Sequence, residues 1–363
     1  MTAWKVWAKR ILIAVLLLLA ILSFLPLWQT DRWWVRQWDY PRLQVACLLA
    51  ALMFGLWLLE HRRSRTFWAV TIGSGAALAW QVSHFLAYFP LYPKEVASAA
   101  NCPTASRVKL LNANVLLTND RMGPLLQQIE RHDPDIVLVL EANDEWVRGL
   151  AGLRNRYPYW LAEPVPNTYG MLLLSRLPMN GGIRHLVQPA VPSVRATVTM
   201  ANGQQFILHG VHPEPPWPGD DSGERDAELV MVGREVRDEG QAAVVLGDLN
   251  DVAWSRTSRL FHEVAGTNDP RVGRGFYPTF NAKYPLLRWP LDHLFVSPHF
   301  KLVDMAVLPD IGSDHFPVLF SLCLVGDADQ RKVSRTAPAG TEAEASQELS
   351  KGLQERSEED RGQ

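Results

Sequence analysis

Three long apolar runs occupy the first hundred residues of this 363-residue chain. They are Ile11–Leu27, Leu43–Leu59 and Phe67–Phe89. A helix needs roughly 20 apolar residues to cross a bilayer, and about 17 at the short limit. The loop after the first run is rich in the aromatic residues that gather at membrane surfaces, namely Trp28, Trp33, Trp34, Trp38 and Tyr40. The sequence therefore predicts a membrane region over residues 1–102 with three transmembrane helices, at about 11–27, 43–59 and 67–89.

The distribution of basic residues predicts the orientation of these helices, because cytoplasmic loops carry an excess of Lys and Arg. One side of the predicted membrane would hold Lys5, Lys9, Arg10, Arg62, Arg63 and Arg65, and the other Arg32, Arg36, Arg42 and Lys94. This pattern favours a cytoplasmic N-terminus and, after three crossings, a domain outside the cytoplasm. A cleaved signal peptide is the alternative for the first run. However, Pro26-Leu27-Trp28 follows that run where a small-residue cleavage site belongs.

The remaining sequence divides into a domain and a tail. Residues 103–325 carry 20 Lys and Arg against 25 Asp and Glu, a net charge of −5. Residues 326–363 have almost no large apolar side chains, so we predict a disordered charged tail. Cys102 and Cys323 stand at the two ends of the domain. They fit either a disulfide in an oxidising compartment or two unrelated small residues.

Several predicted strands of the domain carry a polar side chain at or near one end. They are Val108–Val115 with Asn114, Ile136–Leu140 before Glu141, Gln205–Val211 before His212, Ala243–Leu246 before Gly247-Asp248-Leu249-Asn250, and Phe316–Val325 after Asp314-His315. A buried strand that ends on a bare carboxylate is costly unless something pairs with it. We therefore expect these side chains to converge on one site. Strands outnumber helices and alternate with them, which predicts an α/β domain with layered sheets.

The residue types of this set indicate phosphate chemistry assisted by a divalent ion. Asn114, Glu141 and Asp314 are oxygen donors of the kind that Mg²⁺ prefers, and no Cys/His cluster has zinc spacing. Asn112 competes with Asn114 for this role, and we prefer Asn114 because Val115-Leu116 follows it. His212 and His315 could donate to a phosphoryl oxygen or move protons, and Asp248 could orient a water molecule.

At this point the chain resembles a known family. The ordered series Asn114, Glu141, His212, Gly247-Asp248-Leu249-Asn250, Leu291-Asp292-His293 and Ser313-Asp314-His315 is similar to the endonuclease/exonuclease/phosphatase superfamily, whose members include DNase I. The resemblance covers about residues 106–322. It implies a four-layer α/β sandwich of the DNase I type, with the site at one edge of two packed sheets. The arrangement of apolar N-terminal runs before such a domain resembles a membrane-anchored bacterial subgroup of this superfamily. This resemblance implies a multi-pass protein of the inner membrane.

The resemblance implies a metal site. Asn114 and Glu141 would hold the ion, with Glu141 as the main ligand, and Asp314 would be a further ligand or a partner of a metal-bound water. The ion would be Mg²⁺, with Mn²⁺ as the alternative. The sequence leaves open whether one or two metals bind.

The resemblance also implies the catalytic residues. His315 would contact the scissile phosphate, with Asp292 behind it as the orienting carboxylate. Asp248 would position the attacking water, while Asn250 and His212 would hold the phosphate and its developing charge.

In one respect the chain departs from the family. Several members orient the counterpart of His212 with a Glu on the strand that corresponds to Met171–Leu174. This chain has no Glu there, and Tyr169 is the available substitute.

These inferences predict a membrane-anchored, divalent-metal-dependent phosphoric-ester hydrolase of the phosphodiesterase or phosphatase type. The net charge of −5 and the lack of a basic stripe favour a lipid head group or a small phosphorylated molecule over nucleic acid. A metal-dependent endo- or exonuclease is the alternative. A second alternative is a non-catalytic, membrane-tethered binding protein with the same fold.

Overall fold

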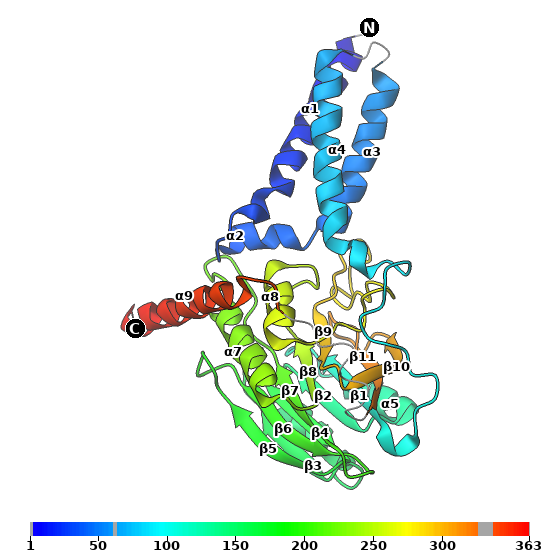
Figure 1. Cartoon of the computed structure of the whole chain (residues 1–363), viewed down its shortest axis with the longest axis vertical. Coiled ribbons are helices and arrows are strands. Elements are labelled where there is room, and N and C mark those ends of the chain that lie inside the picture. Colours follow the sequence, from blue (N-terminus) through cyan, green and yellow to red (C-terminus); the bar gives the residue numbers. More distant parts are fainter. Residues whose placement is uncertain (1–2, 61–63, 326–336, 363) are drawn as a thin grey trace.

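The computed structural model describes residues 3–60, 64–325 and 337–362, and shows three long helices standing on a two-sheet domain (Figure 1). The helices are α1 (Ala3–Ser23), α3 (Arg42–Leu59) and α4 (Arg65–Phe85). Short elements lie between and after them: η1 (Leu25–Leu27), α2 (Trp33–Arg36), η2 (Gln37–Asp39) and η3 (Leu86–Tyr88). Leu16, Leu49 and Val70 are among the buried side chains that pack the three helices together.

Two segments of this bundle, Val6–Leu27 and Arg42–Leu59, are long and apolar enough to cross a membrane. The third predicted span is also helical and forms α4. However, α4 is less apolar than α1 and α3 and is not apolar enough to count as a membrane span by the same criterion. It buries Gln81 inside the bundle, where the amide accepts a hydrogen bond from Arg42 Nη1 (3.0 Å) and donates one to Ser23 Oγ (3.0 Å). Arg62 and Arg63, on which the predicted orientation also rests, lie outside the described residues.

The domain is built on two sheets that pack face to face. The six-stranded sheet has the order β10-β11-β1-β2-β4-β3, and the five-stranded sheet the order β5-β6-β7-β8-β9. The strands are β1 (Arg107–Asn114), β2 (Ile136–Leu140), β3 (Tyr159–Glu163), β4 (Met171–Ser175), β5 (Met179–Arg184), β6 (Ser193–Thr199), β7 (Gln205–Val211), β8 (Ala243–Asp248), β9 (Asp292–Val296), β10 (Phe300–Val307) and β11 (Val318–Leu324). Leu138 of the first sheet and Leu208 and Leu246 of the second belong to the core between them.

Helices cover the outer face of each sheet, which makes four layers. The helices of the first sheet are α5 (Met122–His132) and α6 (Asp144–Gly149), and those of the second are α7 (Gly223–Glu239) and α8 (Arg256–Ala265). Strand β2 is apolar throughout because both of its faces are covered. Leu138 points into the core between the sheets, whereas Val137 and Val139 pack outward with the α5 layer. The α/β sandwich expected from the sequence therefore agrees with the observed layers.

A disulfide joins Cys102 to Cys323, with their Cα atoms 5.8 Å apart. It lies at the neighbouring strands β1 and β11, the first and last strands of the domain along the chain, where Arg107 of β1 pairs with Cys323 of β11. Of the two alternatives that the sequence left open, the bonded pair is the correct one. The cross-link closes a loop that contains nearly the whole domain, and long loops favour stabilisation by a disulfide.

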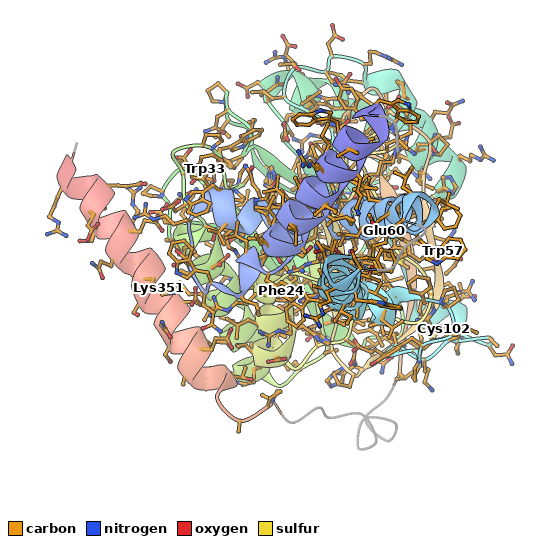
Figure 2. All side chains as sticks on the ribbon, turned by 90° about the horizontal axis from the view of Figure 1, so that it is seen from above. Phe24, Trp33, Trp57, Glu60, Cys102 and Lys351 are labelled. Atoms are coloured by element: carbon orange, nitrogen blue, oxygen red, sulfur yellow. A yellow bond between two sulfur atoms is a disulfide. The ribbon has the colours of Figure 1, made fainter. Side chains whose placement is uncertain are left out.

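The prediction of a disordered tail is wrong for its last part, which forms the helix α9 (Thr341–Gly362). Ala345 and Leu349, four residues apart, share one face of this helix and pack against α7 and α8. Arg256 of α8 donates to Glu344 (2.8 Å) and Glu348 (3.0 Å) of α9. Viewed along the bundle, α9 with Lys351 runs on one side of the domain and Cys102 lies on the other (Figure 2). Residues 326–336 of the predicted tail lie outside the described residues.

A buried network of charges fastens the helical region to the domain. Arg36 of α2 is 5% exposed. Its guanidinium lies 3.6 Å from Asp39, 3.8 Å from Asp226 of α7 and 3.7 Å from Asp251, which follows β8. Arg225 adds a second buried cation beside Asp226 (2.8 Å) and Asp251 (3.5 Å). Two guanidinium groups thus face three carboxylates, so each buried charge has a partner of opposite sign.

An apolar cluster completes this junction. Phe85 at the end of α4 and Tyr88 of η3 pack with Trp254 and Leu291 of the domain. Burial of such large side chains stabilises the contact by about 1.5–3 kcal/mol each. The helical region and the domain are therefore expected to behave as one structural unit.

We expect Arg36→Ala to destabilise the full-length chain by about 3–5 kcal/mol, because it leaves buried carboxylates without their partner. The measurement is the free energy of unfolding in detergent micelles. Arg32→Ala is the matched control, since Arg32 pairs with Asp221 (3.0 Å) with its side chain 65% exposed. That change should cost at most about 1 kcal/mol. Equal losses in the two variants would contradict the importance of the buried network.

Glu228 of α7 makes stability depend on pH. Burial raises the pKa of this carboxyl to about 8, and its Oε1 atom has no hydrogen-bond partner among the described residues. The folded protein thus keeps a proton that the unfolded chain loses near its ordinary pKa of 4.5. Stability therefore falls as the pH rises from about 4.5 to about 8.

Glutamine is neutral at every pH, so we expect Glu228→Gln to increase the free energy of unfolding by at least about 1 kcal/mol at slightly alkaline pH. Such a gain would raise the melting temperature by about 2–4 °C. It should change little near pH 4.5, where the carboxyl is already protonated in both states. Thermal unfolding at the two pH values checks this. Glu130→Gln, at an exposed position on α5, is the control and should show no such pH-dependent gain.

Candidate active site

The strand registers bring the predicted residues to one edge of the two sheets. Strands β1 and β2 are parallel, and so are β7 and β8, so that each pair ends at the same edge. Strand β9 runs antiparallel to β8, and its first residue, Asp292, pairs with Asp248, the last residue of β8. Two carboxylates far apart in the sequence thus become neighbours through backbone pairing alone.

Sharp turns place the side chains that follow these strands. Glu141 has φ 60° and Asn250 has φ 50°, both in the left-handed region that non-glycine residues rarely occupy. Such strain persists where the surrounding structure enforces it, often at functional sites. Gly247 has φ 153°, and a Cβ atom there would lie 1.8 Å from the Val211 carbonyl oxygen. Only glycine lets β8 approach β7 closely enough to set Asp248 in place.

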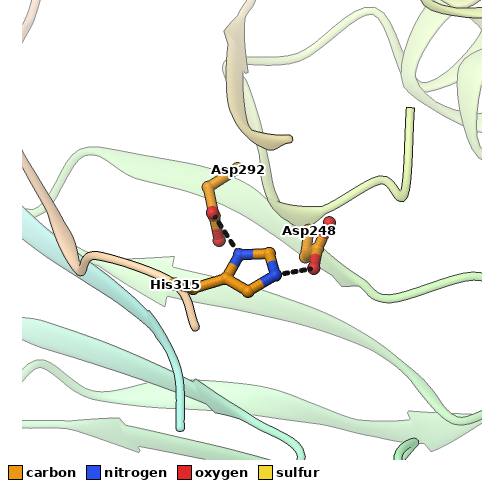
Figure 3. Close-up of side chains that lie close together, drawn as sticks. All are labelled: Asp248, Asp292 and His315. Carbon is orange, nitrogen blue, oxygen red and sulfur yellow. Dashed lines mark hydrogen bonds and ion pairs between the residues drawn. The ribbon is translucent and has the colours of Figure 1, made fainter. Parts of the chain in front are cut away.

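The centre of the site is His315, which lies between two carboxylates (Figure 3). Its Nδ1 donates to Asp292 Oδ2 (2.8 Å), and its Nε2 lies 3.4 Å from Asp248 Oδ2. All three side chains are buried. Burial by itself would lower the pKa of His315, but Asp248 and Asp292 outweigh it and raise the pKa to about 10. The imidazole is therefore a cation held in a fixed orientation at neutral pH.

Two asparagines of β1 support the carboxylates. Residues two apart on a strand face the same side, so Asn112 and Asn114 both point toward the site. Asn112 Nδ2 donates to Asp292 Oδ1 (2.8 Å). Asn114 Nδ2 donates to Glu141 Oε1 (2.9 Å) and to Asp248 Oδ2 (3.2 Å). Both candidates that the sequence offered for one role thus reach the site, Asn112 at Asp292 and Asn114 at Glu141 and Asp248.

Glu141 combines burial with few hydrogen bonds. Besides Asn114, the Leu117 backbone N–H donates to its Oε2 (2.9 Å). Burial raises the pKa of this carboxyl, and the negative charge of Asp314 raises it further. Asp314 is half-buried, and its Oδ1 accepts from Ser313 Oγ (3.4 Å). A nearby cation would offset the effect of Asp314 and stabilise the ionised form of Glu141.

The donor set fits a divalent ion better at Glu141 than around His315. Asp248, Asp292 and His315 have potential ligand atoms within 4.8 Å of one another. However, metal binding needs a neutral histidine, and here both imidazole nitrogens face carboxylates. Glu141 and Asp314, with Asn114 beside them, offer the hard oxygen donors that suit Mg²⁺.

His212 and Asn250 also lie next to Asp248. His212 Nε2 lies 3.9 Å from Asp248 Oδ2. Burial lowers the pKa of His212 more than Asp248 raises it, so the imidazole is neutral. Asn250 Nδ2 donates to the Pro213 carbonyl (2.9 Å), and its backbone N–H donates to Asp248 Oδ1 (2.9 Å). Asn250 thus holds the turn after Asp248 against the residue that follows His212.

Tyr169 does not replace the missing Glu as a hydrogen-bond partner of His212. Its ring centroid lies 6.0 Å from that of His212, and its hydroxyl donates to Glu214 Oε1 (3.0 Å). Among the described residues, none forms a hydrogen bond with His212 Nδ1.

Three residues that sequence reasoning did not single out reach the site. The Tyr40 hydroxyl, from the segment between α1 and α3, donates to the Asn250 carbonyl (2.6 Å), which also accepts from Arg225 Nη1 (2.9 Å). The Phe280 ring lies 4.9 Å from the His315 ring. None of the three carries a recognisable motif. Tyr40 stood out only as one aromatic in a membrane-like segment.

The chain is similar to known proteins in sequence and in fold. Residues 108–315 match the model of the Endonuclease/Exonuclease/phosphatase family. No curated protein matches the chain. Among solved structures, humanized D. rerio TDP2 with 14 mutations is similar with 20% identity and a TM-score of 0.51, over 60% of this chain and 99% of that chain. The human Nocturnin catalytic domain with bound sulfate has 16% identity and a TM-score of 0.50, over 62% and 97%. At these identities the similarity shows the fold alone.

We expect Mg²⁺ to stabilise the wild-type chain, by about 2.7 kcal/mol at roughly 100 times its Kd, and Glu141→Gln to abolish this increment. Thermal unfolding with and without the ion measures it. Glu348→Gln is the control, because Glu348 belongs to a second acidic group with Asp31 and Asp226. An increment that survives in Glu141→Gln but disappears in Glu348→Gln would place the ion at that second group instead.

Proposed function

Because the chain belongs to the endonuclease/exonuclease/phosphatase family, we propose that it is a membrane-anchored phosphodiesterase or phosphatase that depends on Mg²⁺ or Mn²⁺. Members of this family are metal-dependent hydrolases of phosphoric esters, and this chain is such an enzyme. The observation that carries the finer proposal is the buried chain of contacts Asn112–Asp292–His315–Asp248. It fixes one cation and one base side by side, which attack of water on a phosphoric ester requires.

In this proposal Asp248 is the base that orients the attacking water. Burial raises its pKa while His315 lowers it, and a carboxylate with a raised pKa takes a proton more readily. The Nδ1–H of His315 is held by Asp292, so the Nε2–H, which lies 3.4 Å from Asp248 Oδ2, is the group that donates to a phosphoryl oxygen and stabilises the charge that develops there. His212 and the turn at Asn250 line the other side of the phosphate. These groups are fixed before substrate arrives, so little reorganisation accompanies the reaction.

Glu141, Asp314 and Asn114 would hold the divalent ion. When bound, the ion would neutralise charge on the phosphate and polarise its oxygens. The hydrogen bonds from Asn114 to both Glu141 and Asp248 would keep the metal ligand and the base in a fixed relation. The residues of the chain thus supply the orientation, and the ion supplies the positive charge.

The three helices would anchor the enzyme in the inner membrane of a bacterium. Lys9, near the start of α1, forms an ion pair with Glu60 at the end of α3, so these two ends meet far from the domain (Figure 1). Helix α4 begins at the end of the bundle that is far from the domain and runs back to the domain (Figure 1). It would therefore cross the membrane together with α1 and α3. The basic residues at that end favour a cytoplasmic N-terminus. The Cys102–Cys323 disulfide suits a domain outside the cytoplasm.

A lipid head group or a small phosphorylated molecule is the substrate class that charge and anchoring favour. Nucleic-acid binding depends on neutralising many phosphates with Lys and Arg, whereas residues 103–325 have a net charge of −5. A tethered enzyme, by contrast, meets phosphoric esters of the bilayer at high local concentration.

The test is hydrolysis by the full-length chain with Mg²⁺ of DNA, sphingomyelin, glycerophospholipids, inositol phosphates and a soluble reporter phosphodiester. We expect a lipid ester to be cleaved and His315→Gln to lower the rate roughly 100- to 10,000-fold. His132→Gln is the control, because His132 ends α5 just before the start of β2, whereas the site lies at the other end of β2. Cleavage of DNA alone would favour the nuclease. Substrate binding without turnover by the wild type would favour a non-catalytic binding protein.

A further inference from the structure

A hairpin between Phe280 and Trp289 connects the catalytic site to the helical region. At its base, the Ala282 backbone N–H donates to the Asp314 carbonyl (2.7 Å), and Phe280 packs on His315. Near its tip, the Leu286 carbonyl accepts from Gln44 Nε2 (3.1 Å). Gln44 lies in the first turn of α3, one of the two helices apolar enough to cross a membrane. One short segment thus touches a predicted metal ligand at one end and the beginning of a membrane span at the other.

The tip of this hairpin exposes apolar side chains to solvent. Residues 283–287 are all exposed. Leu286 is 85% exposed, Tyr284 61% and Leu287 48%. Isolated exposed apolar residues are common on protein surfaces, but a contiguous group marks an interaction site. Lys283 adds a positive charge beside them, which suits an anionic lipid surface.

The hairpin is held in shape by its own hydrogen bonds. The Phe280 backbone N–H donates to the Trp289 carbonyl (3.0 Å), and Asn281 donates to the Leu287 carbonyl (3.1 Å). Arg288 Nη2 donates to the Ala282 carbonyl (3.1 Å), and the guanidinium lies 4.8 Å from the centre of the Phe316 ring, next to His315. The apolar tip is therefore presented on a rigid support, and its position is coupled to the catalytic residues.

The position of the tip identifies its partner. Gln44 is followed on the same face of α3 by Cys47 and Leu48, both exposed and three and four residues further along the helix. The exposed surface of α3 above Gln44 is thus apolar and faces lipid if α3 spans the membrane. The Leu286 carbonyl contacts Gln44, where this surface begins, so the hairpin tip lies next to the domain end of the exposed surface of α3.

We propose that the tip formed by Tyr284, Leu286 and Leu287 docks on the bilayer that the helices span, and that it presents the His315 site to phosphoric esters of lipids in that bilayer. The inference rests on the proposed function for the identity of the substrate, but the docking itself does not. The tip enters the interfacial layer while the phosphate of a lipid reaches the site, a few residues away along the same hairpin. Soluble esters would reach the site without help from the tip.

The docking is tested with the full-length chain in lipid nanodiscs. A Cys47→Ser background leaves only the disulfide-bonded cysteines, so Leu286→Cys provides a single thiol for an environment-sensitive fluorophore. We expect a blue-shifted emission that is quenched by lipids with a spin label near the head group. Tyr159→Cys, at an exposed position on β3 at the opposite end of the domain (Figure 1), should show neither effect. A Leu286 label as hydrated as the Tyr159 label overturns the proposal.

A second measurement tests the consequence for catalysis. We expect Leu286→Ser combined with Leu287→Ser to lower the ratio of vesicle-borne to soluble ester hydrolysis by about fivefold or more, since burial of each Leu is favourable. Tyr159→Ser should leave the ratio unchanged, and an unchanged ratio in the double variant overturns the coupling to catalysis. If no ester is hydrolysed, the proposed function fails while the fluorescence result still decides on docking.

Discussion

The arrangement of this protein depends on the burial of charge between its helical region and its domain. Arg36 and Arg225 lie among Asp39, Asp226 and Asp251, and removal of one partner would leave its counter-charges in a low-dielectric interior. Asp251 is only three residues from Asp248, the proposed base. The contact that attaches the helices to the domain therefore also fixes the turn on which the proposed base is mounted.

The Asn250 carbonyl makes this dependence specific. It accepts hydrogen bonds from Tyr40 of the helical region and from Arg225 of α7. The residue has a positive φ, so its conformation needs such external support. Asp248 Oδ1 in turn accepts from the Asn250 backbone N–H. Support thus passes from the segment between α1 and α3 to the Asp248 carboxylate through the Tyr40 hydroxyl and the carbonyl and N–H groups of Asn250. The helical region therefore contributes to the geometry of the site.

Much of the domain could be predicted from its strands because burial on both faces leaves a strong signal. The apolar runs Ile136–Leu140 and Gln205–Val211 were placed at their observed bounds as β2 and β7. The strand-end positions of Glu141, His212 and Asp248 also appear where the sequence predicts them. Strand β5 escaped prediction because it contains two adjacent glycines and is exposed or half-buried throughout. Its strand conformation depends on pairing with β6, which no local pattern reveals.

Other features could not be read because they depend on tertiary partners. Helix α9 is poor in large apolar residues, and its order rests on ion pairs to α8 and on two side chains of one face. Asn112 shows its role only when the sheets pack and bring Asp292 within hydrogen-bond distance. The assignment of individual roles to Asn114, Asp314 and His212 stays a prediction, because geometry alone brings these residues together without showing what each one binds.

The pairing of Asp248 with Asp292 has a consequence for how this chain can vary. Side chains alternate between the two faces of a strand, so a shift of one residue between β8 and β9 would turn Asp292 away from His315. The exposed hairpin tip in the connection between these strands, residues 283–287, is not under that restriction. Insertions there would leave the carboxylate pair intact while changing what the protein touches. The pairing of β8 with β9 thus fixes the relative position of the two carboxylates, whereas the hairpin tip can vary in sequence and length.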